Sequence, residues 1–142
     1  MKVGIASDHG GYNLKEQLIS HFKNSNIELI DYGTDSLESC DYPVFAKRVC
    51  EAFLEGKLEY GILICTTGIG MSICANKFKG IRAALVSNLD ECSLTRRHNN
   101  SNFLCMGAKY TTLDEAINYI VTFTNTAFEG GRHERRVNMI EN

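Results

Sequence analysis

The stretch YGILICTTGIGMSICANK, residues 60–77, joins a short apolar run to a glycine-containing turn and then to a segment with helical character. A short run that is apolar at successive positions is typical of a strand buried on both faces of a sheet. The succession of strand, turn and helix predicts a fold of the α/β class. Cys65, which ends the apolar run, is then either a buried core thiol or a reactive group at the end of a strand.

The same alternation extends along the whole chain. Amphipathic patterns between the apolar runs predict helices over residues 12–22, 44–54, 90–97 and 113–123. Strands that alternate with helices require right-handed crossovers, which place helices on both faces of a parallel sheet. We predict a three-layer, Rossmann-like sandwich with a five-stranded parallel sheet, in a single domain over residues 1–142. The predicted strands, all expected to be buried on both faces, are KVGIA (2–6), IELI (27–30), GILIC (61–65), RAALV (82–86) and FLCMG (103–107).

Composition narrows the classes of function. The net charge of −2 gives no overall basic surface for nucleic acid, and no apolar stretch approaches the ~20 residues that cross a bilayer. The first residues do not resemble a secretory leader, so we expect a cytoplasmic protein with neither nucleic-acid nor membrane partners. The six cysteines contain no C-x-x-C spacing, which predicts reduced thiols and no zinc site.

Ligands of open parallel α/β sheets bind beyond the carboxyl ends of the strands, so we expect the site there. Asp8 and His9 follow the first predicted strand, Cys65 ends the third, and Lys109 follows the fifth. Asp8 is either a cap for the next helix or a ligand of a sugar hydroxyl, with His9 as a donor to a phosphate or hydroxyl.

The glycine turn after Cys65 has several interpretations. A lone cysteine after an apolar run is more often a core residue than a catalyst. Gly68 and Gly70, however, lead into a helix whose first N–H groups can bind an oxyanion and stabilise a thiolate. The turn is not a P-loop, and Ile73 stands where a dinucleotide loop needs its last glycine. A cysteine phosphatase would need arginine at the position of Met71 to clamp the phosphoryl group.

Two further groups each have a structural and a functional interpretation. His98 either offsets the negative end of the helix before it or, beside Asn99, supplies a group that titrates near neutral pH and suits opening of a sugar ring. The basic segment over residues 130–142 is either a solvated surface or a short helix that carries Arg132 and Arg136 on one face. Two convergent guanidinium groups are suited to a phosphate dianion.

Five motifs follow one another along the chain: SDHGGYNLKEQL, DYP, GILICTTGIGMSICANKFKGIRAALVS, RRHNNSNFLCMGAK and FEGGRHERRV. Together they resemble the type B ribose 5-phosphate isomerase family, which also includes allose 6-phosphate isomerases and the subunits of galactose 6-phosphate isomerase. The resemblance covers nearly the whole chain, and five motifs in the right order make it more specific than any single motif.

The resemblance implies a metal-free and cofactor-free aldose–ketose isomerase that interconverts ribose 5-phosphate and ribulose 5-phosphate through a cis-enediolate. By this likeness Cys65 moves a proton between C1 and C2, Thr67 assists proton movement between the two oxygens, and His98 opens the furanose ring with Asp8 close by. In this family part of each site comes from the other subunit, so we expect a homodimer or a dimer of dimers, with the segment 130–142 reaching a partner. The remaining implied contacts are the backbone amides of Thr66, Thr67, Gly68, Ile69 and Gly70 for the enediolate, Asn99 and Tyr42 for the sugar, and His9, Lys109, Arg132 and Arg136 for the phosphate.

Two residues depart from the family pattern. Thr66 stands where glycine is common, which adds a β-branched side chain to the anion loop, and Lys109 stands where arginine is usual, which removes a bidentate fork. These departures leave two alternatives open. One is an isomerase of a six-carbon sugar phosphate such as allose 6-phosphate or galactose 6-phosphate, and the other is a sugar-phosphate-binding homologue without turnover.

Overall fold

The computed structural model describes all 142 residues and contains one sheet of five parallel strands in the order β2-β1-β3-β5-β4. The predicted α/β fold with a five-stranded parallel sheet is therefore confirmed. The strands are β1 (Lys2–Ser7), β2 (Glu28–Asp31), β3 (Tyr60–Cys65), β4 (Ala83–Leu85) and β5 (Phe103–Gly107). The helices are α1 (Tyr12–Phe22), α2 (Tyr42–Leu54), α3 (Ile69–Ala75), α4 (Leu89–Asn99), α5 (Leu113–Asn125) and α6 (Arg132–Asn138), with a short 3-10 helix, η1 (His9–Gly11), before α1.

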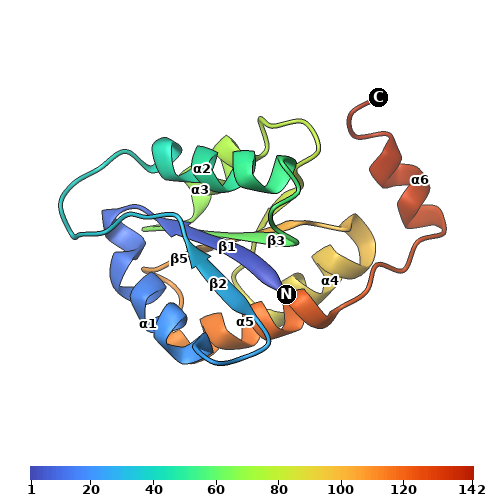
Figure 1. Ribbon diagram of the computed structural model, residues 1–142. Coiled ribbons are helices and arrows are strands. Elements are labelled where there is room, and N and C mark those ends of the chain that lie inside the picture. The colour runs from blue at the N-terminus through green and yellow to red at the C-terminus, as the bar shows by residue number, and fades with distance from the viewer.

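Helices cover both faces of the sheet, which gives the predicted three layers (Figure 1). The helices α2 and α3 pack on one face over a core that includes Leu63 and Phe103. The helices α1, α4 and α5 pack on the other face, where Ile62 and Leu104 lie in a second core. Neighbouring residues of β3 and β5 thus belong to opposite cores, because successive strand side chains point to opposite faces. The alternation explains why both strands are apolar at every position.

The prediction that all five strands are buried on both faces is wrong for β2 and β4. Both are edge strands of the sheet, and none of their residues is fully buried, whereas β5 is buried throughout. Their apolar sequences had predicted burial on both faces, but an edge strand has a neighbouring strand on one side only and is therefore more exposed. The helix predicted over residues 44–54 begins earlier, at Tyr42, with Pro43 in its first turn, where a missing N–H is tolerated.

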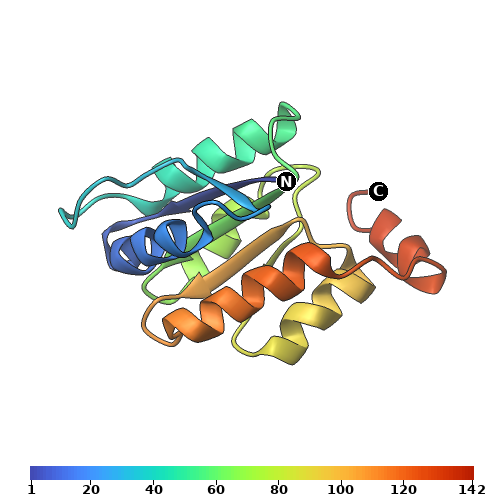
Figure 2. The same ribbon diagram turned by 60° about the horizontal axis from the view of Figure 1, so that its bottom comes forward.

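The last helix, α6, projects from the body of the molecule and is joined to it by the segment after α5 (Figure 2). Its neighbour within the chain is the end of α4. Met139 and Ile140, which follow α6, are 66% and 61% exposed, so this end of the chain leaves apolar surface uncovered. None of the six α-helices combines the length and apolar character that a bilayer crossing requires.

All strands of a parallel sheet finish at one end, which we call the carboxyl edge, and start at the other end, which we call the amino edge. The residues that follow the strands lie at the carboxyl edge, and helices that return antiparallel to the strands end at the amino edge. The end of α4 is at the amino edge, because Asn102 accepts a backbone hydrogen bond from Gly61 at the start of β3. Arg82, which precedes β4, also donates to the Asn99 carbonyl at 3.2 Å. The candidate residues are therefore divided between the two edges.

Candidate active site

Cys65 ends β3 at the carboxyl edge, and the turn that follows it bends back over the thiol. The backbone N–H of Gly68 donates to Cys65 Sγ at 3.1 Å. Gly68 has a φ of +78°, a left-handed conformation that glycine adopts without strain and that allows this turn. The Thr67 hydroxyl oxygen accepts a hydrogen bond from the Ile69 N–H at 3.2 Å. An N–H group directed at sulfur stabilises the thiolate form of a cysteine.

The other buried cysteines have a different environment. Burial raises the pKa of Cys50 and of Cys92 to about 12, and burial also raises the pKa of Cys105, with a further contribution from the neighbouring Cys65 and Cys50. These three thiols stay protonated in the core. All six cysteines are free, as predicted. The contact with the Gly68 amide therefore distinguishes Cys65 from the core thiols that its sequence context resembles.

Asp8 and His9 lie next to this turn, after β1. Asp8 Oδ1 accepts the N–H groups of Gly10 at 2.9 Å and Gly11 at 3.2 Å, so the capping interpretation of Asp8 is correct for η1. His9 Nδ1 accepts the Cys40 N–H at 3.2 Å. An Nδ1 that accepts a hydrogen bond has its lone pair free of a proton, so the proton of the neutral ring is on Nε2. The ring of His9 is thereby fixed as a donor through Nε2.

Glycines permit the close packing of the segments around Cys65. A Cβ atom at Gly107 would lie 2.6 Å from the backbone of Thr67, and one at Gly70 would lie 2.7 Å from the ring of Tyr42. The Thr66 hydroxyl occupies the space that a side chain at position 10 would fill, so Thr66 packs against η1. The Lys109 N–H donates to the Thr66 carbonyl oxygen at 3.0 Å. The carboxyl edge thus brings together Asp8, His9, Tyr42, Cys65, Thr66, Thr67, Gly68, Ile69, Gly70 and Lys109.

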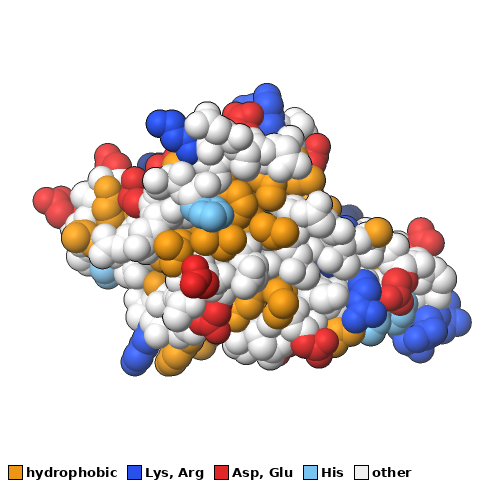
Figure 3. All heavy atoms as spheres, turned by 90° about the horizontal axis from the view of Figure 1, so that it is seen from below, with side chains coloured by type: hydrophobic (Ala, Val, Ile, Leu, Met, Phe, Trp, Pro, Cys, Tyr) orange, Lys and Arg blue, Asp and Glu red, His pale blue; other side chains and the backbone are white.

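The second group of predicted residues lies at the amino edge. His98 and Asn99 form the last turn of α4, and Arg136 lies on the neighbouring α6. These three residues line a cavity of about 360 Å³. Arg132 begins α6, and the helical spacing places it on the same face as Arg136, as predicted. Figure 3 shows Lys and Arg side chains gathered at this projecting end of the molecule, beside His side chains.

Within one chain the two groups are separated by the length of a strand. Gly61, which is hydrogen-bonded to Asn102 at the amino edge, and Cys65 are four strand steps apart. At about 3.3 Å per residue this separation is roughly 13 Å. A hydrogen bond spans about 3 Å, so His98 and Cys65 of one chain are too far apart to contact the same atom of a bound molecule.

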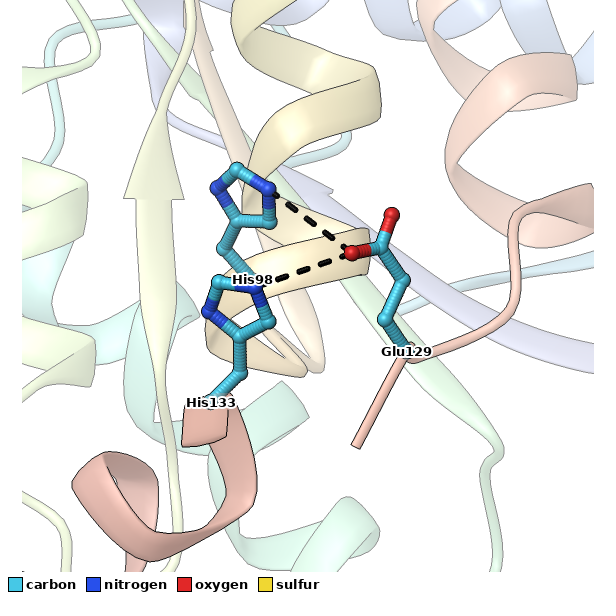
Figure 4. A group of neighbouring side chains, drawn as sticks. All are labelled: His98, Glu129 and His133. Atoms are coloured by element: carbon cyan, nitrogen blue, oxygen red, sulfur yellow. Dashed lines mark ion pairs between the residues drawn. The ribbon is translucent and has the colours of Figure 1, made fainter. Parts of the chain in front are cut away.

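Two residues of the amino-edge group, Glu129 and His133, were not expected from the sequence. The rings of His98 and His133 are stacked with centroids 4.2 Å apart, and both Nε2 atoms face Glu129 (Figure 4). Burial lowers the pKa of His133, and the neighbouring His98 and Arg132 lower it further against the opposing effect of Glu129. The signal available in the sequence was the FEGGRHE pattern, which places a glutamate four residues before a histidine.

Comparison with known proteins identifies the family of this chain. Residues 3–140 match the family profile described as Ribose/Galactose Isomerase. The chain belongs to the ribose/galactose isomerase family. Ribose-5-phosphate isomerase B of Escherichia coli is 41% identical over 139 residues, which cover 98% of this chain and 93% of that protein.

Solved structures agree with the family assignment. A ribose-5-phosphate isomerase B from Clostridium thermocellum superposes with a TM-score of 0.95 at 46% identity, covering 99% of this chain and 95% of that one. A ribose-5-phosphate isomerase B from Mycoplasma genitalium, solved with bound ribulose-5-phosphate, gives a TM-score of 0.91 at 39% identity, with 98% and 93% covered. The sequence match over residues 3–140 and the structural match over nearly the whole chain therefore indicate the same ribose/galactose isomerase family.

Proposed function

We propose that this chain interconverts ribose 5-phosphate and ribulose 5-phosphate, with Cys65 as the base. The observation that carries the proposal is the Cys65 thiol held 3.1 Å from the Gly68 amide, in a chain that matches an isomerase family over residues 3–140. Abstraction of a proton beside a carbonyl needs a base and a means of stabilising the negative oxygen that develops. The turn after β3 supplies both from adjacent residues.

The proton transfer takes place at the carboxyl edge. The Cys65 thiolate removes the proton from C2 of the open-chain aldose, which leaves a cis-enediolate, and the resulting thiol returns the proton to C1 to give the ketose. The amide of Gly70 lies in the first turn of α3, where a helix leaves N–H groups without an internal partner, and it donates to the enediolate oxygens. Thr67 relays the proton between O1 and O2, and Asp8 holds a ring hydroxyl.

The other requirements of the reaction are met by the amino edge of a second copy of the chain. His98 exchanges a proton with the ring oxygen during opening of the furanose, Asn99 binds near the reacting oxygens, and Arg132 and Arg136 hold the phosphate together with His9 of the first copy. A homodimer with two shared sites follows from the separation of the two edges within one chain. The projecting α6 and the exposed residues Met139 and Ile140 support contact with the other copy.

The packing of Thr66 is compatible with turnover. Its hydroxyl packs against η1, and its carbonyl oxygen binds the Lys109 N–H, so the β-branched side chain is accommodated by the absence of a side chain at Gly10. Lys109 keeps a positive charge for the phosphate without the bidentate geometry of arginine. The six free cysteines fit a reducing compartment, and we place the protein in the cytoplasm on that ground.

The test is direct assay of purified protein with ribose 5-phosphate, allose 6-phosphate and galactose 6-phosphate, with a chelator present. We expect turnover of the pentose phosphate and its loss by about 10²–10⁴-fold in Cys65→Ala, the usual contribution of a general base. Cys74→Ala is the matched control, because Cys74 lies in α3 away from the strand end. Full turnover in Cys65→Ala rejects the proposed base, and preference for a six-carbon substrate rejects the proposed sugar.

A further inference from the structure

Three potential metal ligands from separate segments converge at the amino edge. His98 lies in the last turn of α4, Glu129 in the segment after α5, and His133 in α6. Glu129 Oε1 is 4.0 Å from His98 Nε2 and 3.6 Å from His133 Nε2, and the three candidate ligand atoms all lie within 4.8 Å of one another. In Figure 4 both rings present Nε2 to the same carboxylate oxygen.

His133 has a buried polar atom with no partner. The residue is only 8% exposed, and its Nε2 makes no hydrogen bond. The 3.6 Å separation from Glu129 exceeds the 2.7–3.2 Å of an N–H···O hydrogen bond. A buried nitrogen without a protein partner is costly, and in folded proteins such an atom is commonly satisfied by a bound ion or water.

The carboxylate of Glu129 is held in an orientation suitable for a ligand. Arg97 Nη1 contacts Glu129 Oε2 at 3.4 Å, which leaves Oε1 directed at the two histidines. The Glu129 N–H also donates to the Arg97 carbonyl oxygen at 3.1 Å, so the backbone of this segment is fixed against α4. A ligating carboxylate that is oriented by a second partner is a usual feature of metal sites.

We propose that His98, Glu129 and His133 bind a divalent transition-metal ion of the zinc class, and that the bound ion inhibits the isomerase. Two imidazoles and one carboxylate are a common ligand set for zinc, with a fourth position left open. Ligand atoms around a tetrahedral zinc are about 3.3 Å apart. Movements of about 1 Å by the exposed Glu129 side chain and the half-exposed His98 ring bring the three atoms to this spacing.

The inhibition follows because the metal ion and the sugar ring compete for the imidazole of His98. A lone pair that coordinates a metal ion cannot exchange a proton with the sugar ring, so the ion and ring opening compete for the same imidazole. The open coordination position faces the cavity lined by Asn99 and Arg136, where a water or a phosphate oxygen completes the coordination. The inhibition rests on the proposed function of His98, whereas the metal binding does not.

The experiment measures binding and turnover separately on the intact protein. Zn²⁺ binding is followed by titration calorimetry, and the ligand type by the absorption spectrum of the Co²⁺ form, in which thiolate ligands add an intense near-ultraviolet band. The test variant is Glu129→Gln, and the matched control is Glu134→Gln, which removes the same charge from the exposed surface of α6 without removing a ligand. Isomerase activity is then titrated with Zn²⁺ and recovered with a chelator.

We expect Zn²⁺ to bind the protein and Glu134→Gln alike, and Glu129→Gln at least about tenfold more weakly, with inhibition weakened in parallel. The Co²⁺ spectrum should lack the thiolate band. Equal binding by Glu129→Gln, a thiolate spectrum or the absence of binding overturns the site. Binding at the site without inhibition of an active enzyme overturns the competition. Binding by a chain that has no isomerase activity instead contradicts the proposed function and leaves the metal site standing.

Discussion

The division of the site between two sheet edges makes mixed dimers informative. Cys65→Ala removes the proposed base at the carboxyl edge, and His98→Asn removes the proposed ring-opening group at the amino edge. Since the two edges are roughly 13 Å apart along β3, each complete site of the proposed dimer takes Cys65 from one chain and His98 from the other. In a dimer of the two variants, one site carries both defects and the other carries neither.

The size of the recovery follows from random pairing. Equal amounts of the two variants give about one half mixed dimers, and each mixed dimer has one intact site of two, so activity reaches about one quarter of the unsubstituted protein. Each variant alone should fall about 10²–10⁴-fold below it with cyclic substrate. The variants are mixed, unfolded in denaturant, refolded together and assayed with ribose 5-phosphate.

The control pair places both defects at the same edge. Cys65→Ala mixed with Thr67→Ala gives dimers in which every carboxyl edge is defective, so no activity returns. If the first mixture recovers no more activity than the sum of its two parents, although mixed dimers are present, both edges act within one chain and the shared site is wrong. Recovery by the control pair would show that subunits exchange function by another route.

Two further predictions concern the packing around Cys65 and the buried thiols. Gly107→Ala places a Cβ atom 2.6 Å from the Thr67 backbone. We therefore expect a loss of about 1–3 kcal/mol in stability, measured by thermal unfolding, and a fall in kcat, measured by steady-state kinetics. An unchanged kcat would mean that the position of the turn after Cys65 does not affect turnover. The ordinary pKa of a thiol is near 9.0, whereas burial raises the pKa of Cys50 and Cys92 to about 12. Between these two pH values the folded state therefore holds more protons than the unfolded state. The free energy of unfolding falls as the pH rises through this range. Urea titrations across this range should show the fall and a shallower slope in Cys92→Ala, and stability independent of pH there would contradict the burial argument.

The sequence predicted the α/β class and the sheet because its apolar runs and amphipathic segments alternate without interruption. It did not distinguish central from edge strands, since the apolar sequences of β2 and β4 resemble those of buried strands while only the strand order reveals that each has one neighbour. The local features of the Cys65 turn were also predictable, because a glycine such as Gly68 shortly after a strand indicates a tight turn.

The amino-edge group was less accessible to sequence reasoning. His98 and Arg136 were identified through their motifs, but their distance from Cys65 depends on the direction in which α4 returns along the sheet. Glu129 and His133 were missed because their proximity to His98 depends on how α6 packs against the end of α4. Contacts of this kind are set by tertiary packing and leave no periodic pattern in the sequence.

The separation of the two edges also bears on how such proteins diverge. After a gene duplication, one copy can lose residues of its carboxyl edge and the other can lose residues of its amino edge, and a dimer of the two still contains one complete site. Each copy then depends on the other for survival, and the pair is preserved by selection although neither chain is active alone. An arrangement that begins as a symmetric dimer thus provides a short route to an obligate assembly of two different chains.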